Sequence, residues 1–306
     1  MIENKDLKSY EIIIVGAGVA GVSAAIYAKR AGRKVAVIER MLIGGQLNFV
    51  GKIVNYAGFS ETDGATLSNQ LSLQVEKLGI EVIYDEVLDF DFDGVEKEVK
   101  CKKGTYKAKA VILALGGNPR ELEIEGEKTF RGRGVSYCVQ CDGNFFKEKI
   151  VAVVGSNQAA IDGALYLSKL CNKVYLISRF DIKNFSIENL LQQKNIEIVE
   201  GGEARQIVGD DAVTQVIIEK DGKETVILVD GIFVVNGNKP NTALLSGKIE
   251  LSKEGFIICD EAMQTSKEGV YACGDVRQSK LKQISTAVGD GAIAGVEASL
   301  YVQNGK

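Results

Sequence analysis

Two stretches of this chain place an apolar run of strand length before a glycine-rich turn and a helical pattern of small residues. In the first stretch, the apolar run 12–15 stops at Gly16, an alanine-rich helical pattern follows over 19–31, and 35–38 is a second apolar run. Residues 149–180 repeat this order. Two such repeats in a chain of 306 residues predict an α/β fold with two Rossmann-like domains of the dinucleotide-binding type.

The chain has two prolines, and both mark a predicted domain boundary. Pro119 and Pro240 each come shortly after a Gly-Asn pair that follows an apolar run. Proline fixes its own φ and disfavours helix in the residue before it, so both positions are predicted to be stiffened turns. We therefore expect a second domain inserted into the first. The first domain would comprise residues 1–117 and 244–306, and the insert residues 118–243.

The segment after the predicted insert carries two further elements. Residues 268–276 predict a strand that ends in Gly274-Asp275, and residues 287–303 predict a helix rich in small residues. Small side chains would allow this helix to pack closely against a cofactor or against the sheet. Both elements are expected to complete the first domain.

The first turn has the full G-x-G-x-x-G spacing in Gly16, Gly18 and Gly21. The first glycine makes the tight turn, the second lets the backbone approach a pyrophosphate, and the third lets the helix pack on the strand. Glu39, which follows the second strand, lies where an acid would accept ribose hydroxyls. Strand, turn, helix, strand and acid in this order predict a dinucleotide site.

Composition narrows the possible chemistry. The net charge of -4 gives no indication of a nucleic-acid partner. No apolar run is long enough to span a bilayer, and the polar N-terminus lacks the apolar core of a signal peptide, so we expect a cytoplasmic protein without a membrane partner. The chain has no histidine, which excludes Ser-His and Cys-His catalysis and histidine-ligated metals.

Cys138 and Cys141 form the only C-x-x-C pair among six cysteines. Without histidine or a second pair a zinc site cannot close, so no metal is expected. In a reducing compartment an isolated pair is typically redox-active, and a helix start at this point would favour the thiolate. The remaining cysteines are expected to be small buried hydrophobic residues; they are Cys101, Cys171, Cys259 and Cys273.

Asp142 directly follows this pair and has two possible roles. With no histidine in the chain, it has few rivals as the acid/base that a disulfide reaction needs. It is also well suited to cap a helix. Beside a C-x-x-C pair we favour the catalytic role. Arg131 and Arg133, just upstream, would either steer an acidic partner or form solvated surface charge.

Together these pieces resemble the low-molecular-weight thioredoxin reductases over essentially the whole chain. The matching stretches are "GAGVAG" from Gly16, "GGQL" from Gly44, "GRGVSYCVQCDG" from Gly132, "PNTA" from Pro240, "GVYACGDV" from Gly269 and "KQISTAVGDGAIAG" from Lys282. The most specific element is C-x-x-C-D-G just ahead of the second dinucleotide turn. The resemblance implies the class II pyridine nucleotide-disulfide oxidoreductase fold, a homodimer, thioredoxin as electron acceptor and non-covalent FAD in the first domain.

The resemblance also implies which residues act. Cys141 would face the flavin, Cys138 would attack thioredoxin, and Asp142 would be the acid/base. The adenosine half of FAD would contact Gly16, Gly18, Gly21 and Glu39; the isoalloxazine and ribityl side would contact Gly44, Gly45, Gln46, Asn55, Asp275, Gln283 and Ile284. Further cofactor contacts are expected from Ala20, Arg40, Leu47, Val87, Ala114, Gly116, Gly274 and Lys282.

The second turn departs from the pattern of the NADPH-using members. Those members have G-x-G-x-x-A, then a His-Arg-Arg cluster at the strand end and another Arg soon after. Here Asn157 replaces the second glycine, Ser178-Arg179-Phe180 ends the strand, and Asn184 stands at the later Arg. Each lost charge-assisted contact removes about 1.5–3 kcal/mol, so two would weaken NADPH about a hundredfold to ten-thousandfold.

This departure matches a subgroup, the ferredoxin-dependent flavin thioredoxin reductases, which lack a working pyridine-nucleotide site. We therefore expect ferredoxin as the electron donor, NADPH not to be used, and the second turn to be retained for folding. The alternative is an NADPH- or NADH-dependent thioredoxin reductase with atypical contacts. A non-enzymatic flavin redox sensor is a further alternative, although no residues are left over for an output module. A ferredoxin–NADP reductase would need no C-x-x-C.

Overall fold

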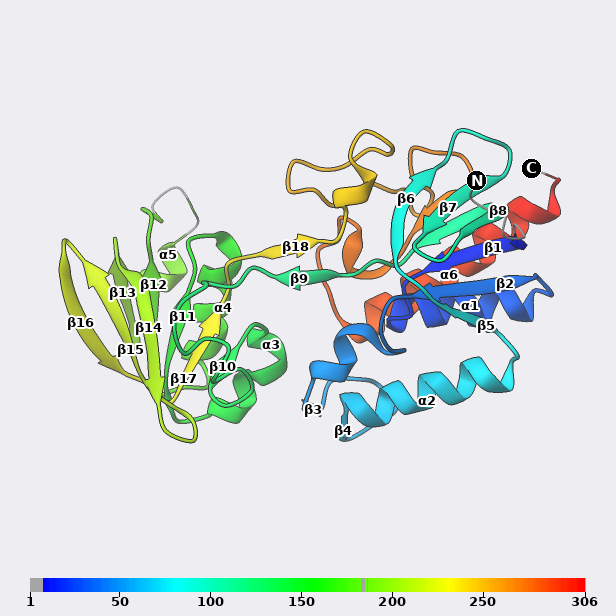
Figure 1. The fold of residues 1–306 in the computed structure, drawn as a ribbon. Helices are drawn as coiled ribbons and strands as arrows, with labels where there is room; N and C mark the ends of the chain where they lie inside the picture. Colours follow the sequence, from blue (N-terminus) through cyan, green and yellow to red (C-terminus); the bar gives the residue numbers. More distant parts are fainter. Residues whose placement is uncertain (1–7, 183–184, 186, 306) are drawn as a thin grey trace. The chain divides into compact units, whose positions relative to one another are not determined.

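The computed structural model describes residues 8–182, 185 and 187–305, and the chain divides into two compact units (Figure 1). Unit 1 is Met1–Asn118 with Lys239–Lys306, and unit 2 is Pro119–Asn238. The chain therefore passes from one unit to the other twice. The two connecting strands, β9 (Gly117–Pro119) and β18 (Asn238–Pro240), pair with each other.

Two details of the predicted boundary are wrong. The prolines do not lie in turns: each is the last residue of a connecting strand, and positive φ values occur just before these strands, at Gly116 (+64°) and Gly237 (+86°). Residues 239–243, and residue 118 at the other end of the predicted insert, belong to unit 1. Hydrogen bonds hold them there, because Asn241 Nδ2 donates to Leu115 O at 2.9 Å and Thr242 Oγ1 donates to Gly255 O at 2.7 Å.

Unit 1 is built on one twisted sheet in the order β5-β2-β1-β8-β7-β6, with β19 also paired to β8. Strands β1, β2, β5, β8 and β19 are parallel, whereas β7 is antiparallel to both of its neighbours. The predicted apolar run alternates across the sheet, since Ile12 and Ile14 join one core and Ile13 and Val15 the other. The strands are β1 (Lys8–Val15), β2 (Val35–Glu39), β5 (Glu81–Tyr84), β6 (Val87–Asp91), β7 (Lys97–Cys101), β8 (Thr105–Leu113) and β19 (Val270–Ala272).

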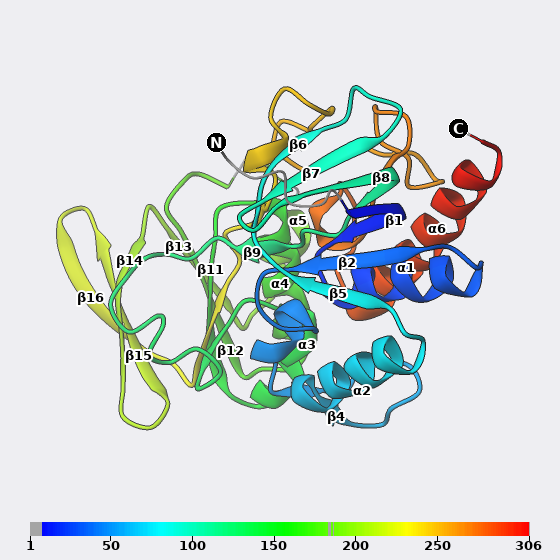
Figure 2. The ribbon, with the colours of Figure 1, turned by 45° about the vertical axis from the view of Figure 1, so that its right-hand side comes forward.

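Helices cover one face of this sheet, where α1 and α6 lie side by side in both views (Figures 1 and 2). The helices are α1 (Val19–Arg30), α2 (Gly64–Lys77) and α6 (Ile284–Gln303). Short elements complete the unit: η1 (Gly45–Phe49), β3 (Lys52–Ile53), β4 (Thr62–Asp63), η3 (Ala243–Leu245) and η4 (Gly274–Val276). Helix α6 begins three residues before the predicted 287, because Gln283 and Thr286 form a reciprocal capping box at its start.

The small residues of α6 serve helix–helix packing. A Cβ added to Gly291 would lie 2.1 Å from Ala20 O, and one added to Gly295 would lie 2.4 Å from Ala24 O, both on α1. The predicted close packing therefore takes place, but at these positions the partner is α1 and not the sheet.

We expect Gly295→Val to lower the free energy of unfolding by about 1–3 kcal/mol or more, because the new side chain meets backbone atoms that cannot move aside. The matched control is Gly289→Ala in the same helix, where a Cβ meets nothing within 4 Å among the described residues. That change should be neutral or should stabilise by about 0.5–1 kcal/mol through helix propensity. Urea unfolding curves of the two variants measure the difference, and equal stability would contradict the packing argument.

Unit 2 contains a parallel sheet in the order β10-β17-β11-β12-β13 and an antiparallel sheet β14-β15-β16. Val151 and Val153 pack with helix α4 on one face of the parallel sheet, and Ala152 and Val154 pack with the antiparallel sheet on the other. The strands are β10 (Val135–Ser136), β11 (Ile150–Val154), β12 (Lys173–Ser178), β13 (Ile196–Glu200), β14 (Glu203–Gly209), β15 (Val213–Lys220), β16 (Lys223–Leu228) and β17 (Gly231–Val234). The helices are α3 (Val139–Asp142), η2 (Gly143–Phe146), α4 (Gln158–Ser168) and α5 (Glu188–Leu191).

Candidate functional site

The first glycine-rich turn joins β1 to α1 and leaves the start of α1 open. A Cβ at Gly16 (φ +104°) would lie 2.3 Å from Ala114 O, and one at Gly21 would lie 1.8 Å from Gly16 O, so both positions require glycine. At Gly18 a Cβ would meet no described atom within 4 Å, and the Gly18 position provides no side-chain cap for the helix. The first amides of α1 therefore receive no side-chain cap from position 18, which suits the binding of an anion.

Glu39 and the Gly44-Gly45 loop meet this turn. The Glu39 carboxylate accepts from Ala17 N at 2.7 Å and from Met41 N at 2.8 Å. Gly44 N donates to Ala17 O at 2.8 Å, and a Cβ at Gly45 would lie 3.1 Å from Gly18 Cα. The segments predicted for the adenosine half of the cofactor and the Gly44-Gly45 segment predicted for its flavin side therefore converge at the start of α1.

A second group of predicted residues gathers near the start of α6. Asn55 Nδ2 donates to Gln283 Oε1 at 3.1 Å. Gln46 Nε2 donates to Gly117 O and to Asn118 Oδ1, both at 2.7 Å. Leu47 and Ile284, which begins α6, pack in one apolar cluster. These contacts bring three separate parts of the sequence together within unit 1.

Asp275 and Lys282 are both partly desolvated in this group. Burial raises the pKa of Asp275, and the nearby Lys282 partly opposes that effect. Burial likewise lowers the pKa of Lys282, whose Nζ donates to Asp275 O and Arg277 O at 2.9 Å each. The ammonium of Lys282 is therefore engaged by its own loop and helps to shape that loop.

Other predicted cofactor residues lie at three places in unit 1: Gly274 beside Ala20, Ala114 beside Gly16, and Arg40 and Val87 near the start of β6. A Cβ at Gly274 would lie 2.8 Å from the Cβ of Ala20. Arg40 is exposed directly after Glu39, and Val87 is half-buried at the start of β6. Lys102, with a smaller contribution from Arg40, lowers the pKa of Glu86, so Arg40 lies close to the start of β6.

An ion pair that the sequence analysis missed braces this loop. Asp290 on α6 is buried, and its carboxylate accepts from Arg277 Nε at 2.6 Å, Arg277 Nη2 at 2.8 Å and Gly274 N at 3.2 Å. It thereby ties η4, which carries Asp275, to α6. Arg277 and Asp290 belong to different elements, and no short sequence motif predicts that they pair.

These residues of unit 1 fit a dinucleotide such as FAD. The uncapped start of α1 suits a pyrophosphate, and Glu39 at the end of β2 suits ribose hydroxyls. Amide and carboxyl side chains at Asn55, Gln283 and Asp275 supply polar partners at the other end. The individual contacts to FAD stay predictions.

The C-x-x-C pair lies in unit 2, where Cys138 and Cys141 form a disulfide with a Cα–Cα distance of 5.3 Å. Cys138 is the N-cap of the short helix α3, and Cys141 N donates to Cys138 Sγ at 3.2 Å. The predicted helix start is therefore present. After reduction, this amide would stabilise negative charge on the Cys138 sulfur.

Asp142, the last residue of α3, does not act as a helix cap. It precedes η2, but its side chain makes no capping hydrogen bond there. Its Oδ2 instead accepts from Ser136 Oγ at 2.6 Å. Burial raises the pKa of Asp142, and the Ser136 hydrogen bond partly opposes this rise. A partly buried carboxyl group with a raised pKa is suited to hold and release a proton.

The second glycine-rich turn differs from the first at the start of its helix. Asn157 caps α4: its Oδ1 accepts from Ala160 N at 2.9 Å, and its Nδ2 donates to Val235 O at 2.8 Å. The side chain of Asn157 thus takes the place that an anion would need at these amides. Asn157 departs from the glycine of the NADPH-using pattern, and in the fold its side chain caps the helix.

At the end of β12, the hydroxyl of Ser178 is also engaged in hydrogen bonds within the chain. Ser178 is fully buried, its hydroxyl shares a 2.9 Å hydrogen bond with that of Ser156, and it lies 2.7 Å from Phe180 O. Phe180 itself is exposed, and Arg179 pairs with Glu203 at 3.4 Å. Asn184, the other predicted departure, lies outside the described residues.

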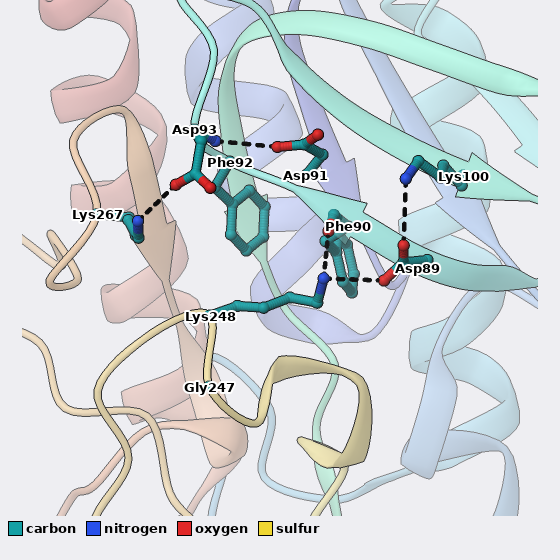
Figure 3. A pocket seen from close by; sticks show the side chains of 9 residues that line it. All are labelled: Asp89, Phe90, Asp91, Phe92, Asp93, Lys100, Gly247, Lys248 and Lys267. Carbon is teal, nitrogen blue, oxygen red and sulfur yellow. Dashed lines mark hydrogen bonds and ion pairs between the residues drawn. The ribbon is translucent and has the colours of Figure 1, made fainter.

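A cavity of about 330 Å³ lies elsewhere in unit 1, along β6, and contains none of the predicted residues (Figure 3). Its three lysines pair with two of its aspartates, because Lys248 and Lys100 both contact Asp89, and Lys267 contacts Asp93 at 2.6 Å. The two lysines lower the pKa of Asp89 to about 2. This internal neutralisation favours a structural role for the network.

The other sequence expectations have mixed outcomes. Cys101, Cys171 and Cys273 are buried free thiols as predicted, whereas Cys259 is only half-buried. Burial raises the pKa of Cys101 to about 12 and that of Cys171 to about 11, which makes both poor nucleophiles. Within the described ranges, no helix has the length and apolar character that a membrane crossing requires, and no cluster of three potential ligands could hold a metal ion.

Comparison with known proteins identifies the family. The model of the pyridine nucleotide-disulphide oxidoreductases matches residues 10–291. Thioredoxin reductase of Peptoclostridium litorale is 37% identical over 306 residues, covering 96% of this chain and 97% of that protein.

Two solved structures are also similar. Thioredoxin reductase from Streptococcus pyogenes is 36% identical with a TM-score of 0.92, covering 98% of this chain and 100% of the other. The ferredoxin-flavin thioredoxin reductase from Clostridium acetobutylicum is 31% identical with a TM-score of 0.55 and the same coverage of both chains. This chain therefore belongs to the pyridine nucleotide-disulphide oxidoreductases and, among them, to the thioredoxin reductase family.

Proposed function

We propose that this protein is a thioredoxin reductase that passes electrons from reduced ferredoxin, through FAD in unit 1 and the Cys138–Cys141 pair in unit 2, to thioredoxin. The observation that carries the choice of donor is the Asn157 cap on α4. Bound FAD would supply a centre that exchanges electrons singly or in pairs. The proposed assembly is a homodimer.

The proposed reaction balances in two stages. Two reduced ferredoxins give one electron each, two protons are taken up, and the Cys138–Cys141 S–S bond is cleaved to two thiols. The dithiol then returns to the disulfide while the thioredoxin S–S bond is cleaved and takes both electrons and both protons. Between plant-type ferredoxins near -400 mV and thioredoxin near -270 mV, two electrons release about 6 kcal/mol.

Three residues of unit 2 would carry the second stage. Cys138, whose sulfur accepts from Cys141 N at 3.2 Å, would attack a thioredoxin sulfur and form a mixed disulfide. Cys141 would then displace thioredoxin and restore the internal disulfide. Asp142 would take the proton from one thiol and give it to the departing thioredoxin thiolate.

The two glycine-rich turns support the choice of donor by their contrast. At the first turn, Gly18 leaves the start of α1 uncapped by its own side chain, and Glu39 stands at the end of the next strand. At the second, Asn157 caps α4, and the buried Ser178 binds Ser156 at the equivalent strand end. The start of α1 thus lacks a side-chain cap, whereas the start of α4 has one.

The alternative is a thioredoxin reductase that uses NADPH or NADH. The relatives of higher identity are named simply thioredoxin reductases, and the family name itself refers to pyridine nucleotides. For this alternative to hold, the Asn157 side chain would have to leave Ala160 N when nucleotide binds, with loss of about 0.5–2 kcal/mol of capping energy.

Anaerobic mixing tests the donor directly. The oxidised, FAD-loaded protein is mixed separately with NADPH, NADH and chemically reduced ferredoxin, and bleaching of the flavin absorbance is followed. We expect rapid bleaching by ferredoxin alone, with NADPH binding about a hundredfold to ten-thousandfold weaker than charge-assisted contacts would allow. Rapid bleaching by NADPH or NADH would refute the ferredoxin route. Failure to reduce thioredoxin with every donor would favour a flavin redox sensor.

A further inference from the structure

We propose that Ser136 is a positioning residue of the redox centre, because its buried hydroxyl joins the Cys138 main chain to the Asp142 carboxyl group and favours the ionised form of that acid. This inference deepens the proposed thioredoxin-disulfide chemistry and depends on it, but it is independent of the electron donor. Ser136 ends the short strand β10, two residues before the first redox cysteine.

Ser136 makes a connected set of contacts although only 6% of its surface is exposed. Its Oγ accepts from Cys138 N at 3.0 Å and donates to Asp142 Oδ2 at 2.6 Å. Asp142 N in turn donates to Cys138 O at 3.1 Å. The three residues therefore form a closed ring of hydrogen bonds around the start of α3.

The ring constrains the direction of the Ser136 proton. A serine hydroxyl has one donor and two acceptor positions, and the Cys138 amide occupies one acceptor position. The proton then has two available acceptors: Asp142 Oδ2 at 2.6 Å or Cys138 O at 3.4 Å. Only the first contact is short, and a hydroxyl–carboxylate hydrogen bond is the stronger type.

This geometry stabilises the ionised form of Asp142 more than the protonated form. When Asp142 is ionised, Ser136 donates to it across the short contact. When Asp142 is protonated, a hydrogen bond from the acid to Ser136 would turn the serine proton toward Cys138 O, where the contact is long. Ser136 thus stabilises the carboxylate and lowers the pKa of Asp142. Burial raises that pKa and is the larger of the two effects, so the two act in opposite directions.

Charged neighbours do not offer a competing explanation among the described residues. Helix α3 packs against η2 and α4. The η2 segment has no titratable side chain, and on α4 the exposed Asp162 accepts from Gln158 at 2.9 Å. The ring of Tyr166 lies at Gly143, which follows Asp142. Burial raises the pKa of Asp142, and the Ser136 hydrogen bond acts in the opposite direction.

The consequence concerns proton transfer during thioredoxin reduction. A carboxyl group that is buried and lacks a donor stays protonated and cannot take a proton from a thiol. With Ser136 in place, the carboxylate form is favoured against burial, so Asp142 can lose its proton and regain it. The buried hydroxyl would therefore keep the acid/base exchangeable.

The test follows Asp142 itself by infrared difference spectroscopy of the protonated carboxyl C=O stretch as pH is changed. Asp142→Asn identifies the band by removing it. In Ser136→Ala we expect the band to persist to higher pH than in the wild type, because the carboxylate has lost its donor. Ser136→Thr keeps a hydroxyl on a β-branched residue suited to a strand, and it should titrate like the wild type.

Turnover with thioredoxin gives the second readout. At neutral pH, Ser136→Ala should reduce thioredoxin about tenfold more slowly or worse, and the rate should recover as the pH rises. An Asp142 band in Ser136→Ala that titrates at the wild-type pH would overturn the proposal, as would an Asp142→Asn variant with unchanged turnover. If the wild type reduced no thioredoxin with any donor, the proposed function would fail while the infrared titration would still decide the role of Ser136.

Discussion

Replacing either Cys138 or Cys141 by serine is expected to abolish thioredoxin reduction, with turnover at least about a thousandfold lower. The two sulfurs form one disulfide, and neither alone can carry the electron pair between flavin and thioredoxin. The double variant should be no worse than either single variant, since both sulfurs act as one unit. Turnover is measured with whichever donor bleaches the flavin.

Flavin bleaching is the control for these variants. Because the predicted FAD residues lie in unit 1 and the cysteines in unit 2, both serine variants should still bind FAD and be bleached by the productive donor. Turnover retained by either variant would contradict the assignment of this pair as the redox centre. Loss of FAD would instead point to misfolding, and Cys171→Ser, at a buried thiol of the same unit, would then show whether a cysteine change alone disturbs it.

The two variants should also differ from each other. The helix amide that donates to Cys138 Sγ favours the thiolate at this position, so Cys138 should be the one to attack thioredoxin. In Cys141→Ser, the remaining Cys138 should form a lasting mixed disulfide with a thioredoxin that has a single redox cysteine activated by a thionitrobenzoate group. Cys138→Ser should form little of it, and the reverse pattern would exchange the two roles.

The parallel strands and their adjoining helices were predicted well because the hydrophobic pattern that identifies them lies within a short stretch of sequence. Apolar runs of strand length, a glycine turn and small helical residues identified β1, α1 and β2, and likewise β11, α4 and β12. Gly16 and Gly21 could be predicted because the spacing itself encodes the close approach of a helix to a strand. The antiparallel sheet β14-β15-β16 was not predicted, since its strands carry no comparable motif.

The errors arose where a side chain acts on a distant or unexpected partner. Proline was assigned to turns, whereas the prolines end paired strands and the positive φ values before those strands lie at Gly116 and Gly237. The start of α6 was placed too late because Gln283 is an unusual N-cap residue. Ser136 and Asp290 were missed entirely, because their roles depend on hydrogen bonds that exist only in the folded chain.

Asp290 gives the second large prediction: Asp290→Ala should lower the free energy of unfolding by about 3 kcal/mol or more. The change leaves the Arg277 guanidinium, only 20% exposed in its side chain, without the carboxylate that binds it at 2.6 and 2.8 Å. It also removes the acceptor of Gly274 N. A buried charge that loses its partner is far more destabilising than the pair is stabilising.

Asp290→Ala should also weaken FAD binding. This second effect would show that Asp290 holds the proposed flavin-side loop in place and does not only stabilise the fold. Asp290 holds η4, with Asp275, against α6, whose start adjoins Gln283, so its loss should release the proposed flavin-side loop. Equilibrium dialysis of FAD and urea unfolding of the apoprotein measure the two effects separately. The matched double variant Arg277→Met/Asp290→Leu removes both charges and should regain most of the stability, because no unpaired charge stays buried. If the double variant were as unstable as Asp290→Ala, packing at position 290 and not the unpaired guanidinium would be the cause.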